Sequence, residues 1–374
     1  MLNHQELVAQ LDKVSKDLCV KFARQKDIAR QVWDSIKDDQ ELCKKLQSRK
    51  WSMLVPSWNG LIGFYKNIES VSLPYAVLAV DGSQIYYDKH QGPACYLINV
   101  GSVLLRYGSV KSSVEMSSQP LVIVSSDSDS GSQTAEVVNS QREEFELKAA
   151  VEKSTKFLND GHETPFICLF DGTLIFSNVD VQGSDEKQNF LQSYFQQLHE
   201  LSEKKIVHAG YISFPRAKEL VNVLKIVLSQ YDENNVQGLS VLDGLTDMDV
   251  ASYFLKPGQR STVFQSKSPV VYAYPKHLKP YFCYMHVGFE IVRLEFPQWI
   301  ACDQNLVDFM CSVALDQAQK GKGYPVCLFE AHEQAVIKAM DREFFYIMIQ
   351  KMTQKYDGSY QSSCKSMKKA QVPM

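Results

Sequence analysis

The chain lacks long apolar runs and paired cysteines, and these absences exclude several classes of protein. No window reaches about 18 uninterrupted apolar residues, so we expect no membrane-spanning helix. The amino terminus has no basic region followed by an apolar one, which argues against a secretory signal. None of the nine cysteines forms a Cys-x-x-Cys pair. That spacing argues against zinc knuckles and disulfide scaffolds and favours the reducing cytoplasm.

Excess positive charge and nucleotide-binding glycine motifs are missing as well. The formal net charge is −3, so any nucleic-acid binding has to rest on local patches. Neither a P-loop nor a Rossmann fingerprint is present, so nucleotide hydrolysis would have to come from a partner. The acidic run over 125–132 lacks the spaced glycine and terminal glutamate of an EF-hand, and we interpret it as a loop.

Two apolar runs that each lead into an aspartate are the most informative feature present. The run over 77–80 reaches Asp81, and the run over 165–170 reaches Asp171. Continuous runs of this length predict strands buried on both faces. Carboxylates at the ends of neighbouring strands would converge on one point. Acidic oxygens with no fixed cation among them suit a hard divalent ion such as Mg²⁺ or Mn²⁺.

The N-terminal 50 residues have a helical pattern with a narrow apolar seam. Leu7, Leu11, Val14 and Leu18 follow a 4-3-4 spacing, as in a coiled coil. This seam packs either on its own domain or against a partner, and the spacing does not decide between the two.

After Pro74 the pattern changes to strands with helices between them. Three strands in short succession predict an antiparallel meander over 77–81, 96–106 and 120–125. A helix rich in strong helix formers is expected over 135–159. The elements expected further on are a helix over 187–204, a strand over 206–213, a helix over 216–225, a capped turn over 243–249, strands over 281–287 and 289–296, and a helix over 303–320.

Several glutamates on the helix over 135–159 compete for the role of a third carboxylate. Most glutamates on such a helix are solvated. We select Glu146 because it stands beside Phe145 and Leu147, where a helix can approach the sheet closely. Glu144 and Glu152 remain the alternatives.

His332 is predicted to follow a short buried strand over 326–329 and to lie in the first turn of a helix over 331–345. The positive end of the helix dipole would keep the ring neutral, as a metal ligand or a base requires. Arg260 and Ser261 lie in a turn that suits a phosphate contact and equally suits a plain surface. Arg293 and Glu295 share one strand face, which favours an internal ion pair over catalysis.

In their order, these motifs resemble the NurA family of nucleases, which partner a HerA-type hexameric translocase in processing DNA ends. The resemblance covers roughly residues 75–345. The matching pieces are Ala79–Ser83, Arg142 with Glu146, Leu169–Leu174, Ala209–Ser213, Pro257–Ser261, Val292–Pro297, and Gly323, Tyr324, Glu330 and His332.

The resemblance implies an α/β fold with an RNase H-like mixed sheet core flanked by helices. Residues 1–70 would form an N-terminal helical region, 71–350 the nuclease domain and 351–374 a polar tail. It further implies Mn²⁺- or Mg²⁺-dependent 5′-to-3′ exonuclease activity on DNA, endonuclease activity on single strands, and a homodimer. The implied metal ligands are Asp81, Glu146, Asp171 and His332, with Tyr324 as a supporting active-site residue. The N-terminal helix is one candidate for docking the ATPase.

Two other interpretations compete with this one. An aspartyl-phosphate phosphatase would need a nucleophilic aspartate at position 169, which is a leucine. A non-catalytic RNase H-like adaptor of a DNA-translocase complex is the stronger alternative. Retention of the acids argues against it, because an inert scaffold has no reason to hold carboxylates at buried strand ends.

Overall fold

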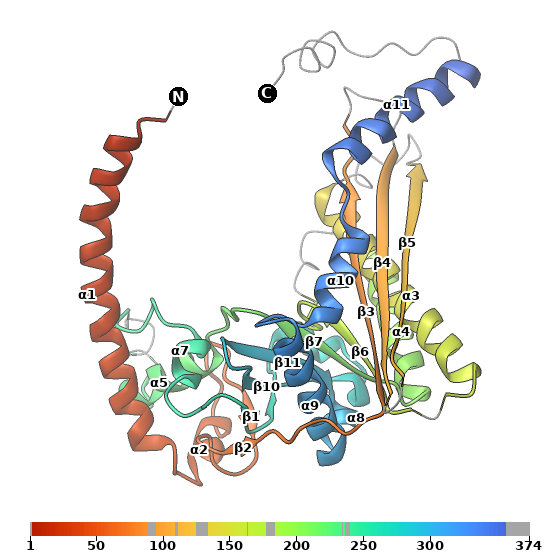
Figure 1. The fold of residues 1–374 in the computed structure, drawn as a ribbon. Coiled ribbons are helices and arrows are strands. Elements are labelled where there is room, and N and C mark those ends of the chain that lie inside the picture. The colour runs from red at the N-terminus through yellow and green to blue at the C-terminus, as the bar shows by residue number, and fades with distance from the viewer. Residues whose placement is uncertain are drawn as a thin grey trace. The chain divides into compact units, whose positions relative to one another are not determined.

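The computed structural model describes residues 2–88, 95–108, 111–124, 134–162, 164–176, 184–233, 235 and 240–356 (Figure 1). The chain divides into two compact units. Unit 1 consists of Met1–Val71, Gly172–Ile175 and Ala209–Tyr324, and unit 2 of Ser72–Asp171, Phe176–His208 and Pro325–Met374. Neither unit is therefore one contiguous segment. The acidic run over 125–132 and the polar tail beyond 356 lie outside the described residues.

Unit 1 is organised around short antiparallel strands. Its strand order is β1-β9-β10-β11-β7, and β8 pairs with both β2 and β10. The strands are β1 (Ser57–Trp58), β2 (Tyr65–Asn67), β7 (Val207–Ile212), β8 (Gln259–Ser261), β9 (Phe264–Gln265), β10 (Pro280–His286) and β11 (Ile291–Pro297). The helices are α1 (His4–Ile36), α2 (Leu42–Gln47), α5 (Glu219–Leu228), α7 (Asp247–Ala251), η2 (Pro269–Ala273), η3 (Lys276–Leu278), α8 (Gln298–Ala301) and α9 (Gln304–Lys320).

Helix α1 is anchored only by its C-terminal half. Trp33 is buried and stacks on Phe254, with 4.7 Å between the ring centroids. In the N-terminal half, the predicted seam residues Leu7, Leu11 and Val14 are exposed. Leu18 has no described side chain. The seam is thus not covered by any described residue of its own unit.

The described part of unit 2 contains the long strands and four helices. Strands β3 (Tyr75–Ile85), β4 (Cys95–Tyr107) and β5 (Ser113–Val124) form the predicted antiparallel meander, and β6 (Phe166–Asp171) runs parallel to β3. The helices are α3 (Ala135–Asn159), α4 (Ser184–Glu203), α10 (Val326–Ala335) and α11 (Ala339–Tyr356). This arrangement, a sheet with helices against it plus helices at the N-terminus, confirms the predicted mixed α/β class.

Two glycines mark the faces of this sheet on which helices lie. A Cβ atom at Gly82 would meet side chains of α3, whereas one at Gly101 would meet the backbone of α10. Asp81 pairs directly with Gly101, so Gly82 and Gly101 point to opposite faces. Helices α3 and α10 therefore sandwich the middle of β3 and β4.

Several sequence-based predictions about elements were wrong. Residues 326–329 form the start of α10 rather than a strand. The segment over 331–345 is not one helix, because α10 ends at Ala335 and α11 begins at Ala339. Helix α5 begins at Glu219, after Lys218, and not at 216.

No helix in the described ranges combines the length and the apolar character that crossing a bilayer requires.

Candidate active site

The two predicted aspartates lie side by side in the sheet of unit 2. The last residues paired between the parallel strands β3 and β6 are Val80 and Phe170. Asp81 and Asp171 follow them in the same register, and neighbouring strands lie about 4.8 Å apart. Strand β6 ends at Asp171, but β3 continues to Ile85 because β4 still pairs with it there. On the side of β4, Asp81 is therefore still part of a paired strand, whereas on the side of β6 the pairing has already ended at Val80.

Gly82 allows α3 to approach the sheet rather than allowing a turn. A Cβ atom there would lie 2.5 Å from Glu146 Oε1 and 2.7 Å from Arg142 Cγ. The sequence predicted a strand that ends at Asp81, but β3 continues to Ile85. The glycine instead lets the Glu146 carboxylate lie against the backbone next to Asp81.

Glu146 belongs to the acidic cluster, which consists of Asp81, Glu146 and Asp171, and its pKa is strongly raised. Its side chain is 15% exposed and lies 3.2 Å from Arg142 Nε, measured from Oε1. Burial raises its pKa from 4.5 to about 8, an effect that the Arg142 guanidinium opposes. The negative charges of Asp81 and Asp171 raise the same pKa further. Buried Oε1 also lacks a hydrogen-bond partner. This carboxylate thus has Arg142 as an ion-pair partner but no hydrogen-bond donor to its buried oxygen.

His332 reaches Asp81 from α10. Its Nδ1 lies 2.7 Å from Asp81 Oδ2, and its side chain is 56% exposed. The other carboxylate oxygen of Asp81 accepts a hydrogen bond from the Gly82 amide at 2.8 Å. The imidazole donates from Nδ1, so Nε2 is the ring nitrogen left for another contact.

The predicted position of His332 within its helix was wrong. Helix α10 begins at Val326, so His332 lies in the last turn and not in the first. The positive end of the helix dipole is therefore distant from the ring, and the dipole argument for a neutral imidazole does not apply.

Polar side chains of the sheet hold the C-terminal end of α10 in place. Asn99 Nδ2 donates to the carbonyl oxygens of Ala335, at 2.8 Å, and of Gln334, at 3.2 Å. The Ser83 hydroxyl donates to the same Ala335 carbonyl. Ser118 Oγ donates to Asn99 Oδ1 at 3.0 Å, which fixes the orientation of the amide. These contacts satisfy carbonyls that a helix end leaves without partners.

The other predicted site residues belong to unit 1. Tyr324 packs edge-on against Tyr211, with ring centroids 5.7 Å apart. Arg260 is only 2% exposed, and it donates to Asp308 Oδ1 at 2.9 Å. Ser261 is fully buried, and its hydroxyl accepts from the Tyr284 amide. Arg260 and Ser261 are thus both engaged in contacts inside their unit.

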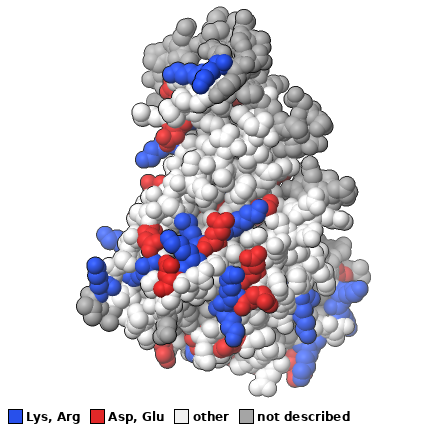
Figure 2. Space-filling model, turned by 90° about the vertical axis from the view of Figure 1, so that its right-hand side faces the viewer, with Lys and Arg blue, Asp and Glu red and all other residues white. Residues whose placement is uncertain are grey.

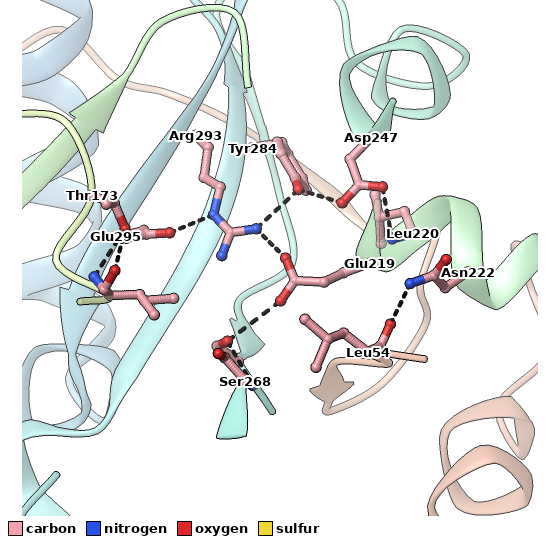
Figure 3. Close-up of polar contacts among 12 residues, drawn as sticks. Leu54, Thr173, Glu219, Leu220, Asn222, Asp247, Ser268, Tyr284, Arg293 and Glu295 are labelled. Atoms are coloured by element: carbon pink, nitrogen blue, oxygen red, sulfur yellow. Dashed lines mark hydrogen bonds and ion pairs between the residues drawn. The ribbon is translucent and has the colours of Figure 1, made fainter. Parts of the chain in front are cut away.

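Unit 1 also contains a buried polar network that confirms the expected ion pair (Figure 3). Arg293 Nε donates to Glu295 Oε1 at 2.8 Å, and its NH1 group donates to Glu219. Tyr284 donates to Asp247 Oδ2 at 2.7 Å. The pair was predicted from strand alternation. Glu219 and Asp247 were missed, because nothing in their local sequence reveals partners far along the chain.

The donors in unit 2 suit a hard divalent cation, although they are not gathered around one point. Among the residues that the structure describes, no three His, Cys, Asp or Glu side chains form a group able to hold a metal ion. Asp81 is engaged by His332 and Glu146 by Arg142. The buried Glu146 oxygen without a donor is nevertheless what an oxygen-seeking cation would satisfy.

Comparison with known proteins places the chain in a family. A family model of the NurA domain matches residues 75–337. The chain belongs to the NurA domain family. The match includes Asp81, Glu146, Asp171, Tyr324 and His332.

Solved structures of NurA resemble this member of the NurA family at low identity. One, described as the crystal structure of NurA, is 11% identical, covers 76% of this chain and 90% of its own, and has a TM-score of 0.39. NurA with manganese is 10% identical, with 92% and 97% covered and a TM-score of 0.40. NurA bound to dAMP and manganese is 14% identical, with 92% and 96% covered and a TM-score of 0.38. A search of curated proteins gave no match.

Proposed function

We propose that this protein is a divalent-metal-dependent DNA nuclease whose cation ligands are Asp81, Glu146, Asp171 and His332. The observation that carries the proposal is the Glu146 carboxylate, whose buried Oε1 lacks a hydrogen-bond donor and whose pKa is raised to about 8 by burial and by the charges of Asp81 and Asp171. A carboxylate with a buried oxygen near like charges is costly unless a cation or a proton compensates it. Membership of the NurA family supports the same assignment.

The residues of the site have distinct roles in this proposal. The three carboxylates supply hard oxygen ligands, and His332 contributes a ring nitrogen. His332 also donates to Asp81 and so orients that carboxylate. Arg142 offsets part of the local negative charge beside Glu146. A bound Mn²⁺ or Mg²⁺ would activate water and stabilise the charge that develops on the phosphodiester oxygens. Tyr324 is proposed as a supporting residue for a phosphate oxygen.

The finer assignments follow from the family. We propose 5′-to-3′ exonuclease activity on linear duplex ends, endonuclease activity on single strands, and a role in DNA end resection and repair. A homodimer and a HerA-like hexameric ATPase are the proposed protein partners. The ATPase would deliver duplex DNA, since the chain has no nucleotide-binding motif of its own. Manganese is the ion named in two of the solved NurA structures.

The decisive experiment is a cleavage assay with matched variants. The protein is incubated with end-labelled duplex and single-stranded DNA in Mn²⁺, in Mg²⁺ or with chelator. We expect metal-dependent cleavage that Asp81→Asn and Asp171→Asn each reduce at least 100-fold, since removing one charged ligand weakens the whole ion site.

Glu152→Gln is the control, because it removes a carboxylate from the same helix and also tests an alternative third ligand. It should cleave like the parent, whereas Glu146→Gln should not. Full activity in Asp81→Asn would remove the proposed ligand role. Absence of cleavage by the parent with either metal, alone and with the ATPase, would favour the non-catalytic adaptor.

A further inference from the structure

A hollow of about 230 Å³ opens in unit 2 between strands β4 and β5 and the C-terminal end of α3. Strand β4 contributes Arg106, β5 contributes Glu115, and α3 contributes Lys153, Lys156 and Phe157. None of these residues belongs to the acidic cluster. The hollow is therefore a separate feature of the same unit.

The cations around this hollow are not fully neutralised. Lys153 and Lys156 form no ion pair with any residue that the structure describes. The Arg106 guanidinium pairs with Glu115 through NH2 and lies over the Phe157 ring at 5.5 Å. Its Nε is buried and has no acceptor. Two free ammonium groups and one unused guanidinium donor thus surround a single space.

The lining of the hollow carries negative as well as positive charge. The lining includes two acids, Glu115 and Asp160, against the three cations. On the face of the molecule seen in Figure 2, basic side chains alternate with acidic ones and leave a broad uncharged area above them. No continuous basic field covers that face.

We propose that this hollow binds a phosphate group of nucleic acid. Lysine ammonium groups and a guanidinium are the usual protein partners of phosphate oxygens. The hydroxyls of Ser102 and Ser117, 2.8 Å apart, stand in the same lining and add neutral donors.

The hollow lies on the α3 face of the sheet, because Ser102, Leu104 and Arg106 alternate with Gly101 along β4, whereas Asp81 and His332 meet on the α10 face. Gly101 pairs with Asp81, and Arg106 lies five residues further along β4, about 17 Å away at strand spacing. Lys153 lies seven residues beyond Glu146 on α3, about 10 Å away at helical rise. A phosphate bound in the hollow would thus lie on the α3 face, apart from the carboxylate of Asp81 and the ring of His332.

This inference rests on the proposed nuclease function for its choice of DNA, but its test does not require cleavage. Binding of a fluorescent 12-nucleotide single strand is measured by anisotropy in EDTA, at salt concentrations between 50 and 200 mM. We expect the double variant Lys153→Ala/Lys156→Ala to bind about tenfold more weakly. The slope of log K against log salt should become less steep by about 1.4, or 0.7 for each lost contact on a single strand.

The matched control is Lys148→Ala, which removes a lysine of the same helix that is paired with Glu144 at 2.6 Å. It should leave affinity and slope unchanged. Circular dichroism and melting temperature establish that all variants fold. Unchanged binding by the double variant, or an equal loss in the control, would overturn the phosphate site.

A second arm identifies the source of the phosphate. A deoxynucleoside monophosphate competes for the same site in the parent and in the double variant. If the double variant loses affinity for the 12-nucleotide strand alone, the hollow binds polymer DNA. If it loses affinity for the mononucleotide to the same extent, the hollow binds the released product. If the parent binds DNA in this way but never cleaves it, the nuclease proposal fails while the phosphate site stands.

Discussion

Asp247 shows how a single buried carboxylate connects several elements of unit 1. Its Oδ1 accepts the backbone amides of Leu220 and Val221, at 2.8 and 3.0 Å, and so caps the start of α5. Its Oδ2 accepts the hydroxyl of Tyr284. The side chain is fully buried, and Glu219 stands nearby. Burial first, and the Glu219 charge second, raise its pKa to about 6.

This raised pKa gives a pH dependence with a definite sign. The protonated form is favoured by folding, so the group stabilises the native state below about pH 4 and loses that contribution as the pH rises through 6. The loss is roughly 3 kcal/mol at most. We expect Asp247→Asn to lack this decline while retaining an oxygen acceptor for α5. Urea unfolding at pH 4.5, 6 and 7.5 measures it.

Asp247→Ala distinguishes the charge from the cap. It should be less stable than Asp247→Asn at every pH, by about 1–3 kcal/mol, because two buried amides lose their acceptor. Asp38→Asn removes an exposed aspartate and should leave the parental pH profile intact. A parental decline that persists in Asp247→Asn would assign it to another group.

The contacts of individual residues were predictable from the sequence mainly where the partner residue is local. The run over 243–249 was interpreted as a capping turn, and the Thr246–Asp249 capping box is present. Asp247 lies between them but caps a different helix, 27 residues away from Leu220. In the same way, Asp81 and Asp171 follow from strand patterns, whereas the Glu146 approach depends on Gly82 meeting α3. Such long-range encounters leave no signal in spacing.

Among the elements, α10 was the one whose type was mistaken. Its opening residues 326–329 form a short apolar run, which periodicity cannot assign to strand or helix. Buried Cys327, Leu328, Ala331 and Ala335 follow helical spacing, and they pack on β3 and β4. The helix over 135–159 was predicted with its observed bounds, because 25 residues of strong helix formers leave no such ambiguity.

Helix α10 can pack this closely on β4 because Gly101 has no side chain. A Cβ atom there would collide with the helix backbone at Ala331 and Ala335. We expect Gly101→Val to displace the C-terminal turn of α10, lower the melting temperature and separate His332 from Asp81. Cleavage in Mn²⁺ should then fall at least tenfold, since the variant disturbs one proposed ligand and leaves the three acids in place.

Removal of the hydrogen bonds that Asn99 donates to α10 should destabilise the packing of this helix less than Gly101→Val does. Asn99→Ala leaves the Gln334 carbonyl without its donor and removes one of the two donors to Ala335, at a cost of about 1–2 kcal/mol. Val114→Ala alters an exposed residue of β5 outside the hollow and should not affect His332. Equal cleavage by Gly101→Val and Val114→Ala would show that α10 does not need its contact with Gly101.

For the whole molecule, the decisive feature is that the first 71 residues are part of unit 1. The sequence predicted a helical extension that ends at residue 70, before a nuclease domain. The structure pairs β1 with β9 and β2 with β8, so this segment supplies strands as well as helices. Its buried side chains Trp33, Leu42, Leu46, Trp58 and Ile62 belong to one core with Leu220, Phe264 and Phe282.

We therefore expect a long and a short N-terminal truncation to differ strongly in their effect on folding. Removal of residues 2–71 deletes five large core side chains, each contributing roughly 1.5–3 kcal/mol. Their sum is comparable to the whole stability of a domain, about 5–15 kcal/mol, so unit 1 should fail to fold. Removal of residues 2–20 deletes only the exposed half of α1 and should leave the melting temperature within about 3 °C. Scanning calorimetry and size-exclusion chromatography compare the two. A monodisperse, cooperatively melting product of the longer deletion would show that residues 1–71 are an appendage, as the sequence first predicted.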